Sequence, residues 1–255
     1  MSPTEKFELF KDLHQPGNPI ILYNIWDAGS AAKVVESGAK AVATGSKPLA
    51  MAQGYPDGEV IPLDRLISSA EQIVNAVEVP VSIDFEGGFA KADNELLNRN
   101  ITRLLKTGVI GINFEDQVMG EGGLYDMKQQ MDRIRVIKET TENIGAPLFI
   151  NSRTDLFLQE KDKTKHVHLI SEAKKRGQAY KAAGADGFFA PGLDSLELIE
   201  DLCSHVQLPV NILKYPTGPS HQELACCGVG RISYGPFGYT ELMGKYQQLA
   251  QHVYS

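Results

Sequence analysis

Short apolar runs recur along the chain, separated by segments whose apolar residues repeat every three to four positions. The runs predict eight strands, at residues 20–24, 40–44, 81–84, 109–114, 148–151, 187–190, 210–213 and 230–234. Uninterrupted apolar runs of this length are typical of parallel strands that are buried on both faces. A unit of one strand and one helix takes about 30 residues or more. The pattern therefore indicates consecutive βα units.

Helical patterns fill the segments between these runs, at residues 30–37, 63–77, 94–107, 126–143, 170–183, 195–204, 220–226 and 239–253. Glycine follows three of them directly, at Gly38, Gly108 and Gly184, and Gly228 comes two residues after a fourth; a left-handed glycine commonly ends a helix. Eight alternating units predict one (β/α)8 TIM-type barrel domain over residues 1–255. An open doubly wound sheet is the rival fold, but no G-x-G-x-x-G motif follows a strand.

Two neighbouring predicted strands stop at carboxylates. The first run ends in Asp84 and Glu86, and the second ends in Glu115 and Asp116. A carboxylate at the end of a buried strand is costly unless a cation meets it. Oxygen-rich clusters without thiols suit Mg²⁺ or Mn²⁺. Because active sites of such barrels form at the carboxyl ends of the strands, we expect a metal site at that rim.

Composition excludes several classes of binding partner for this barrel. The 255 residues carry a net charge of −7 and contain no basic stripe, which argues against nucleic acid as a partner. No apolar run approaches the roughly 18 residues of a membrane span, and the polar N-terminus does not resemble a signal peptide. Three cysteines form no disulfide framework or zinc spacing. We therefore expect a cytoplasmic protein that acts on a small molecule.

An ordered set of motifs at the strand ends is more specific. The motifs are Trp26-Asp27-x-x-Ser30, Gly54-x-Pro56-Asp57-Gly58, Asp84-x-Glu86-x-Gly88, Gly111-Ile112-Asn113-x-Glu115-Asp116 and Asn151-x-Arg153-Thr154-Asp155. Together they resemble the isocitrate lyase/phosphoenolpyruvate mutase superfamily, and within it the short, phosphoenolpyruvate phosphonomutase-like branch. The resemblance implies a Mg²⁺-dependent enzyme that makes or breaks bonds next to a 2-oxo or enolate carboxylate. It also implies a homodimer or homotetramer.

The resemblance assigns roles by position. Asp84 becomes the principal metal carboxylate, and three further carboxylates hold the metal largely through its waters: Asp57, Glu86 and Glu115. Five residues are expected to bind the substrate: Thr44, Gly45, Ser46, Arg153 and Asn211. Of these, three are also expected to take part in catalysis: Thr44, Ser46 and Arg153.

Elementary chemistry supports these roles. A 2-oxo acid chelates Mg²⁺, which then stabilises the enolate left when the neighbouring bond breaks. Donors at Gly45 and Ser46 suit the same developing charge, and the planar fork of Arg153 suits a carboxylate. Structural alternatives stay open: Asp116 as the partner of an arginine, and Asp27 as a helix N-cap.

One loop departs from the family. Isocitrate and methylisocitrate lyases carry Lys-Lys-Cys-Gly-His after the fourth strand, whereas residues 117–124 here read QVMGEGGL. The thiol usually assigned as the acid/base is therefore missing, as are the lysine and asparagine of the mutase loop. Three glycines make the segment suitable as a mobile lid, and Glu121 is its one titratable group. Glu121 is interpreted as a solvated carboxylate. Because the loop lacks the cysteine and lysine of the family, we expect it to gate the site and not to transfer protons.

These observations favour a Mg²⁺-dependent lyase or decarboxylase that cleaves a C–C bond next to a 2-oxo or 2-hydroxy carboxylate through a metal-stabilised enolate. Loss of CO₂ from a 3-carboxy-2-oxo acid needs a metal and an enolate pocket, but it does not need the missing thiol. Phosphoenolpyruvate mutase-like or phosphonopyruvate-cleaving P–C chemistry is the alternative reaction. A catalytically inactive barrel that binds a carboxylate is the alternative of another class.

Overall fold

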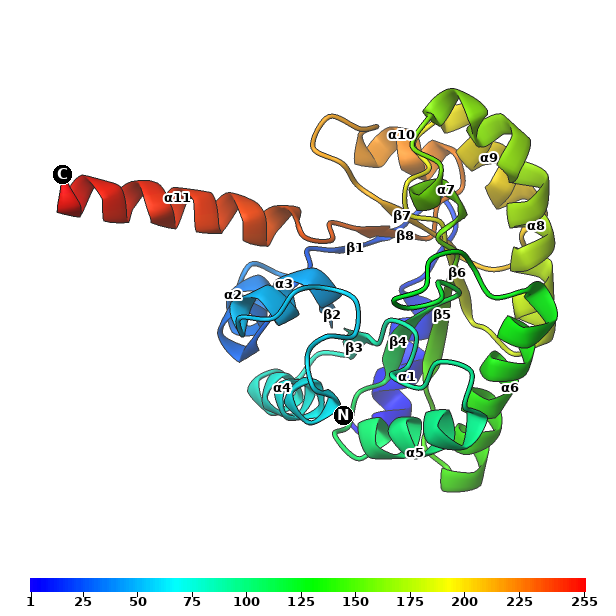
Figure 1. Cartoon of the computed structure of the whole chain (residues 1–255), viewed down its shortest axis with the longest axis horizontal. Coiled ribbons are helices and arrows are strands. Elements are labelled where there is room, and N and C mark those ends of the chain that lie inside the picture. Colours follow the sequence, from blue (N-terminus) through cyan, green and yellow to red (C-terminus); the bar gives the residue numbers. More distant parts are fainter.

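A computed structural model that describes residues 1–255 shows the barrel (Figure 1). The strands are β1 (Ile20–Leu22), β2 (Val42–Ala43), β3 (Val81–Asp84), β4 (Gly111–Glu115), β5 (Phe149–Arg153), β6 (Gly187–Phe189), β7 (Val210–Leu213) and β8 (Arg231–Ser233). All are parallel, in the order β1-β8-β7-β6-β5-β4-β3-β2. A bridge between Ile25 and Thr44 joins the two ends of this sheet. The predicted (β/α)8 fold and its eight strands are confirmed.

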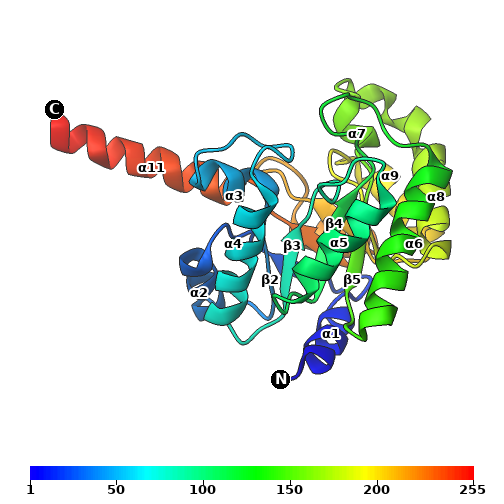
Figure 2. The same ribbon diagram turned by 60° about the horizontal axis from the view of Figure 1, so that its bottom comes forward.

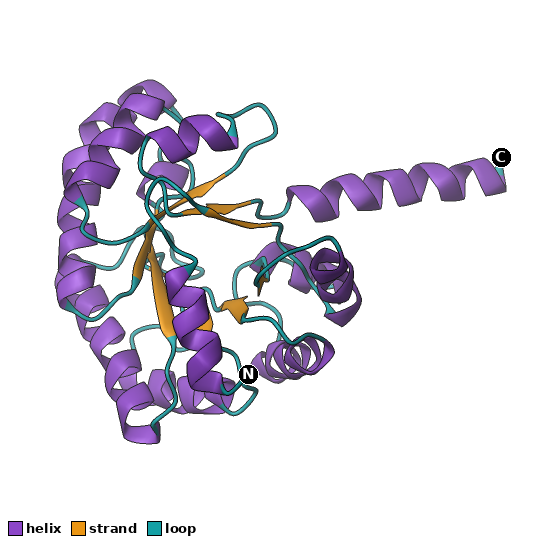
Figure 3. Ribbon diagram, turned by 180° about the vertical axis from the view of Figure 1, so that it is seen from behind, coloured by secondary structure: helices purple, strands orange, loops and turns teal.

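The helices are α1 (Pro3–Asp12), α2 (Ala28–Glu36), α3 (Ser46–Ala52), α4 (Leu63–Ala76), α5 (Asn94–Leu105), α6 (Met127–Ile144), α7 (Leu156–Gln159), α8 (His166–Ala182), α9 (Leu196–His205), α10 (His221–Cys226) and α11 (Phe237–Tyr254), with a 3-10 turn at Lys163–Lys165. Apart from α1 and α11, they surround the strands (Figure 3). Helices α1, α3 and α7 were not predicted. The four glycines expected after helices all have positive φ.

Helix α1 closes the amino-terminal end of the barrel (Figure 2). Its buried Phe7 and Phe10 pack with the first layer of barrel side chains, which includes Ile110 and Phe149. Burial of an aromatic side chain of this size stabilises the fold by about 1.5–3 kcal/mol. With the amino end filled, a small molecule can enter the barrel at the carboxyl ends of the strands.

Helix α11 leaves the barrel and extends away from it (Figure 1). Only Tyr239 of this helix is buried. Its apolar residues Leu242, Tyr246, Leu249 and Val253 are exposed, and their spacing of four, three and four places them on one face of the helix. None of the helices is long and apolar enough to pass through a lipid bilayer.

Candidate active site

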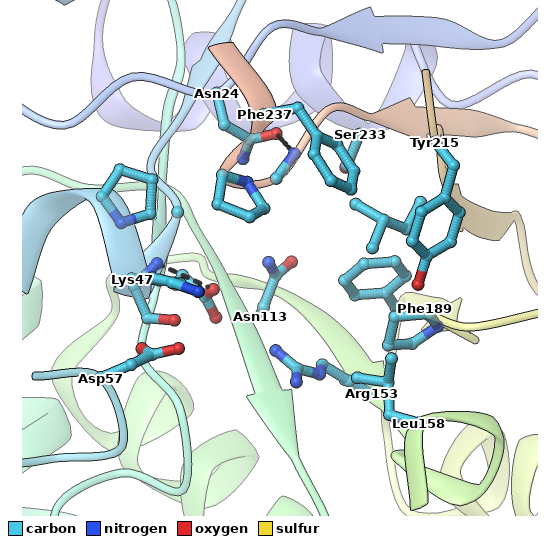
Figure 4. A pocket seen from close by; sticks show the side chains of 18 residues that line it. Asn24, Lys47, Asp57, Asn113, Arg153, Leu158, Phe189, Tyr215, Ser233 and Phe237 are labelled. Atoms are coloured by element: carbon cyan, nitrogen blue, oxygen red, sulfur yellow. Dashed lines mark hydrogen bonds between the residues drawn. The ribbon is translucent and has the colours of Figure 1, made fainter. Parts of the chain in front are cut away.

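A pocket of about 250 Å³ opens at the carboxyl ends of the barrel strands (Figure 4). Side chains of both charge signs lie on one side of it, and aromatic and aliphatic side chains lie on the other. Asp57, Asp84, Ser46 and Arg153 line it, as the sequence predicted. Thr44, Glu86, Glu115 and Asn211 do not line it.

Asp84 ends β3 and points into the barrel, and only 7% of it is exposed. Its Oδ2 accepts a hydrogen bond from the Ser46 amide at 3.1 Å. Its Oδ1 is buried and has no hydrogen-bond partner. A buried carboxylate oxygen without a donor is costly. This oxygen is therefore suited to bind a cation or to carry a proton.

Within the segment Thr44–Ser46, Thr44 supports Asp84, whereas Gly45 and Ser46 line the pocket. The Thr44 hydroxyl accepts a hydrogen bond from the Asp84 amide at 2.8 Å, and Thr44 is fully buried. The Gly45 amide donates to the Ile25 carbonyl. The Thr44 hydroxyl therefore positions Asp84 below the pocket, and the expectation that Thr44 binds substrate stays a prediction. The Ser46 side chain lines the cavity.

Glu86 sits in a tight turn just beyond β3. Its φ of 49° is left-handed, which is a strained conformation for a residue other than glycine. Its Oε2 accepts a hydrogen bond from the Glu59 amide at 2.8 Å, and Oε1 of Glu59 accepts one from the Phe89 amide at 2.7 Å. The Arg133 guanidinium donates to the carbonyl of Gly87. These contacts join the turn to the loop that carries Asp57.

Glu115 and Arg153 are paired by strand register. They lie opposite each other on β4 and β5, and their Oε2 and Nη1 atoms are 2.8 Å apart. Nε and Nη2 of Arg153 also donate to the two oxygens of Asp155 at 2.6 and 2.9 Å. Arg153 thus neutralises two carboxylates before any substrate arrives, and its remaining N–H groups face the cavity that it lines.

The carboxylates at this rim repel one another. Burial, and after it the charges of Asp84 and Asp57, raise the pKa of Glu86 to about 8. Burial and the charge of Asp84 raise the pKa of Asp57. Burial raises the pKa of Glu115 well above its usual range, although Arg153 opposes the shift. This is the electrostatic pattern of a carboxylate cluster that a cation would stabilise.

The donor set suits a hard divalent cation. It consists of oxygens without thiols, and Asp84 Oδ1 is buried and unpaired. No three side chains among His, Cys, Asp and Glu lie close enough together to hold a metal ion directly. The geometry therefore fits Mg²⁺ bound through Asp84, with water filling most of its shell, as is usual for Mg²⁺.

The opposite side of the pocket is apolar. Leu158, Phe189, Leu213, Tyr215 and Phe237 form this wall. Phe189 and Leu213 end β6 and β7, whereas Leu158, Tyr215 and Phe237 lie beyond the strands. The sequence did not predict this wall, because its residues come together only when the barrel closes.

Lys47 lies on the charged side (Figure 4). It lines the cavity at the start of α3 and is exposed. The sequence signal for Lys47 was its place directly after Thr44-Gly45-Ser46, but the unpredicted helix α3 was needed to show where it points.

Two structural alternatives from the sequence are confirmed. Asp116 Oδ2 accepts hydrogen bonds from Arg176 at 2.9 Å and from the Tyr180 hydroxyl at 2.7 Å. It lies behind the site and supports it, since its Oδ1 accepts a hydrogen bond from the Asp155 amide. Asp27 is the N-cap of α2.

Comparison with known proteins agrees with this geometry. A family model described as phosphoenolpyruvate phosphomutase matches residues 10–254. The crystal structure of a protein from Burkholderia cenocepacia J2315 that is assigned as a phosphonomutase superposes with a TM-score of 0.95 at 38% identity, covering 98% of this chain and 99% of that one.

Two curated relatives carry named activities. 2-Methylisocitrate lyase from Escherichia coli (strain K12) is 25% identical in an alignment of 265 positions that covers 95% of this chain and 84% of the relative. Oxaloacetate decarboxylase from Pseudomonas entomophila (strain L48) is 24% identical in an alignment of 239 positions that covers 90% of this chain and 78% of the relative. Barrel, strand-end motifs and family model agree over nearly the whole chain. The chain belongs to the phosphoenolpyruvate phosphomutase family, and so is an enzyme of the isocitrate lyase/phosphoenolpyruvate mutase superfamily.

Proposed function

We propose that this enzyme is a Mg²⁺-dependent lyase that cleaves a C–C bond next to a 2-oxo or 2-hydroxy carboxylate, with decarboxylation of a 3-carboxy-2-oxo acid as the leading reaction. One observation carries the proposal. The buried, unpartnered Oδ1 of Asp84 lies in a pocket that also holds Asp57, Ser46 and Arg153 and that faces an apolar wall. A hard cation and the polar head of a 2-oxo acid fit the first side, and an uncharged leaving group fits the second.

Mg²⁺ held by Asp84, and through water by Asp57, Glu86 and Glu115, would supply a Lewis acid that polarises the 2-oxo group. The protein groups then orient the substrate. The free N–H groups of Arg153 receive its carboxylate, while Glu115 and Asp155 keep the guanidinium plane fixed. Such preorganised groups cost no reorientation during the reaction.

The apolar wall favours decarboxylation. A carboxylate that faces Leu158, Phe189 and Leu213 loses hydration, whereas the CO₂ formed from it is uncharged and needs none. The carbanion equivalent left behind needs a proton. Among the lining side chains, Lys47 and Tyr215 carry protons that can be transferred more readily than those of serine. Lys47 has no ion-pair partner, so we assign it first.

P–C chemistry is the weaker candidate. A phosphonate dianion calls for several cationic donors beyond the metal. The charged donors that line this pocket are Lys47 and Arg153, and Arg153 is already shared between two carboxylates. The pocket therefore suits a leaving group that becomes neutral.

A substrate panel tests the proposal. Oxaloacetate, 2-methylisocitrate, dimethylmalate and phosphonopyruvate are each incubated with Mg²⁺ or with EDTA, and the 2-oxo acid product and phosphate are measured. We expect release of a 2-oxo acid from a carboxylate substrate, dependent on Mg²⁺ and lost in Asp84→Asn. Release from phosphonopyruvate alone would establish P–C chemistry instead. Turnover of none, with Mg²⁺-dependent binding of oxalate intact, would indicate the inactive barrel.

We also propose that the enzyme is a homodimer or homotetramer assembled through α11. The apolar face of α11, formed by Leu242, Tyr246, Leu249 and Val253, has no partner within the chain. Ile21 on the outer face of β1 and Tyr23 just beyond this strand are exposed as well. Burying both surfaces against a second copy would remove an apolar patch that a monomer rarely exposes.

A further inference from the structure

Arg231 is a fully buried cation inside the barrel that has no carboxylate partner. It lies on β8, none of its surface is exposed, and no acidic oxygen lies within ion-pair distance of it. An unpaired buried charge is expensive. No nearby titratable group compensates the buried charge. Asp84 acts on Arg231 only at longer range. Burial, followed by the charge of Arg231, lowers the pKa of His14 to about 3. His14 is therefore neutral.

The contacts of Arg231 fix the orientation of an amide in the pocket floor. Its Nη2 donates to Asn113 Oδ1 at 3.1 Å. Because a guanidinium only donates, the side-chain atom of Asn113 that faces it must be the oxygen. Asn151 Nδ2 donates to the same oxygen at 2.9 Å. The NH₂ group of Asn113 is thereby turned away from this network.

Asn113 lines the pocket, where it lies between the charged side and the apolar wall (Figure 4). Its Nδ2 has no partner within the protein, so its two N–H donors are available to a ligand. Strand register places Asn113 opposite Asp84, which puts this donor beside the proposed metal carboxylate.

A second branch of the network ends in the same way. Nε of Arg231 donates to Ser233 Oγ at 3.2 Å, and Ser233 Oγ donates to Asn211 Oδ1 at 3.2 Å. Asn211 Nδ2 is then a buried donor without an acceptor. Both branches thus lead from one cation through acceptor oxygens to N–H groups without an acceptor. Of these, the N–H groups of Asn113 border the pocket, where an anion would accept hydrogen bonds from them.

We infer that Arg231 is a positioning residue, which turns the amide N–H groups of Asn113 into the pocket so that they donate to an anionic oxygen of the substrate or of its enolate. The inference rests on the proposed function and deepens it, because it adds an uncharged donor to the groups that recognise the 2-oxo acid head. Removal of a hydrogen bond to a charged group typically weakens binding by about 10- to 100-fold.

Binding of oxalate in the presence of Mg²⁺ tests this role by calorimetry, because oxalate is a planar mimic of the enolate of a 2-oxo acid. Asn113→Ala should weaken oxalate about 10- to 100-fold, and Arg231→Met should weaken it by a similar factor. The double variant should bind no more weakly than Asn113→Ala alone, because Arg231 acts through Asn113. Asn98→Ala, on the outer helix α5, is the matched control and should bind as the wild type does.

The wild type, the two single variants and the double variant form a double-mutant cycle. Their unfolding free energies supply a measurement that needs no ligand. Coupling between Arg231→Met and Asn113→Ala supports the contact, and additive effects overturn the inference. If Asn113→Ala binds oxalate as tightly as the wild type does, the inference is also overturned. This test does not depend on whether Arg231→Met folds. Failure of the wild type to bind oxalate with Mg²⁺ would instead reject the proposed function, and the inference with it.

Discussion

Replacing Glu86 with a glutamine, which cannot ionise, should stabilise the metal-free enzyme at neutral pH. Burial and the neighbouring carboxylates raise the pKa of Glu86 to about 8 in the folded state, whereas a glutamate in an unfolded chain ionises near about pH 4.3. Between these values the folded state holds a proton that the unfolded state has lost. The unfolding free energy therefore falls as the pH rises through this window, by at most about 1.4 kcal/mol per pH unit for one group.

The expected size follows from this slope. From about pH 6 to about pH 7.5, Glu86 should cost the metal-free wild type about 2 kcal/mol, or about 4–8 °C in melting temperature for a chain of this length. Glu86→Gln keeps an acceptor for the Glu59 amide but cannot ionise, so this part of the slope should vanish. His14, with its pKa lowered to about 3, acts in the opposite direction below about pH 6.5, but it is present in both proteins and cancels in their difference.

Thermal unfolding followed by circular dichroism in EDTA measures the effect. Wild type and Glu86→Gln are compared across the window, and Glu95→Gln, an exposed position on α5, is the matched control. We expect the melting temperature of the wild type and of the control to fall relative to that of Glu86→Gln as the pH rises. Parallel curves for all three proteins would refute the reasoning and show that Glu86 is already ionised at pH 6.

Three further results are expected from the same structure. Glu121→Gln should change kcat by less than about tenfold, because Glu121 is exposed on its loop and a true general acid is worth 10²–10⁴; a thousandfold loss with normal metal binding would make it the acid/base. Arg176→Met should lower the unfolding free energy by about 3–5 kcal/mol, because it leaves Asp116 buried without a cation, and chemical denaturation measures this. Sedimentation at micromolar concentration should show a dimer or tetramer, and Leu249→Glu should shift it toward the 27.9 kDa monomer; a monomeric wild type contradicts the assembly.

The fold was predictable because its signals are local. Each strand is a short apolar run, and the positions of Gly38, Gly108, Gly184 and Gly228 marked helix ends that the structure confirms. The carboxylates were predictable for the same reason, since Asp84 and Glu115 directly end apolar runs. The observed strand ends differ from the predicted ones in detail. The predicted strand stops at residue 151, whereas β5 continues to Arg153, which pairs with Glu115 on β4.

The pairing of side chains across the barrel could not be predicted from local pattern. Arg231 and Asn113 are 118 positions apart, and their contact depends on closure of all eight strands. The contact of Thr44 with Asp84 could not be predicted for a related reason. Pairing of β2 with β3 brings the Thr44 hydroxyl to the amide of Asp84. Lys47 was missed because α3 is short and carries no clear apolar periodicity.

The crowded carboxylates link metal binding to pH. Four carboxylates gather at this rim: Asp57, Asp84, Glu86 and Glu115. Among them, Glu115 pairs directly with an arginine, Arg153. The excess negative charge can be relieved by a proton, as the raised pKa of Glu86 indicates, or by a divalent cation. The two compete for the same charge, so binding of Mg²⁺ should release a proton near neutral pH.

This competition predicts that the association constant for Mg²⁺ rises between about pH 6 and about pH 8, by up to about tenfold per pH unit for one released proton. Calorimetry in buffers of different ionisation enthalpy counts the protons directly. Glu86→Gln should release fewer protons and flatten the rise, whereas Glu95→Gln should not. A wild-type affinity that does not change with pH would mean that the metal binds without displacing a proton, and the carboxylates at the rim would then be fully ionised in the metal-free enzyme.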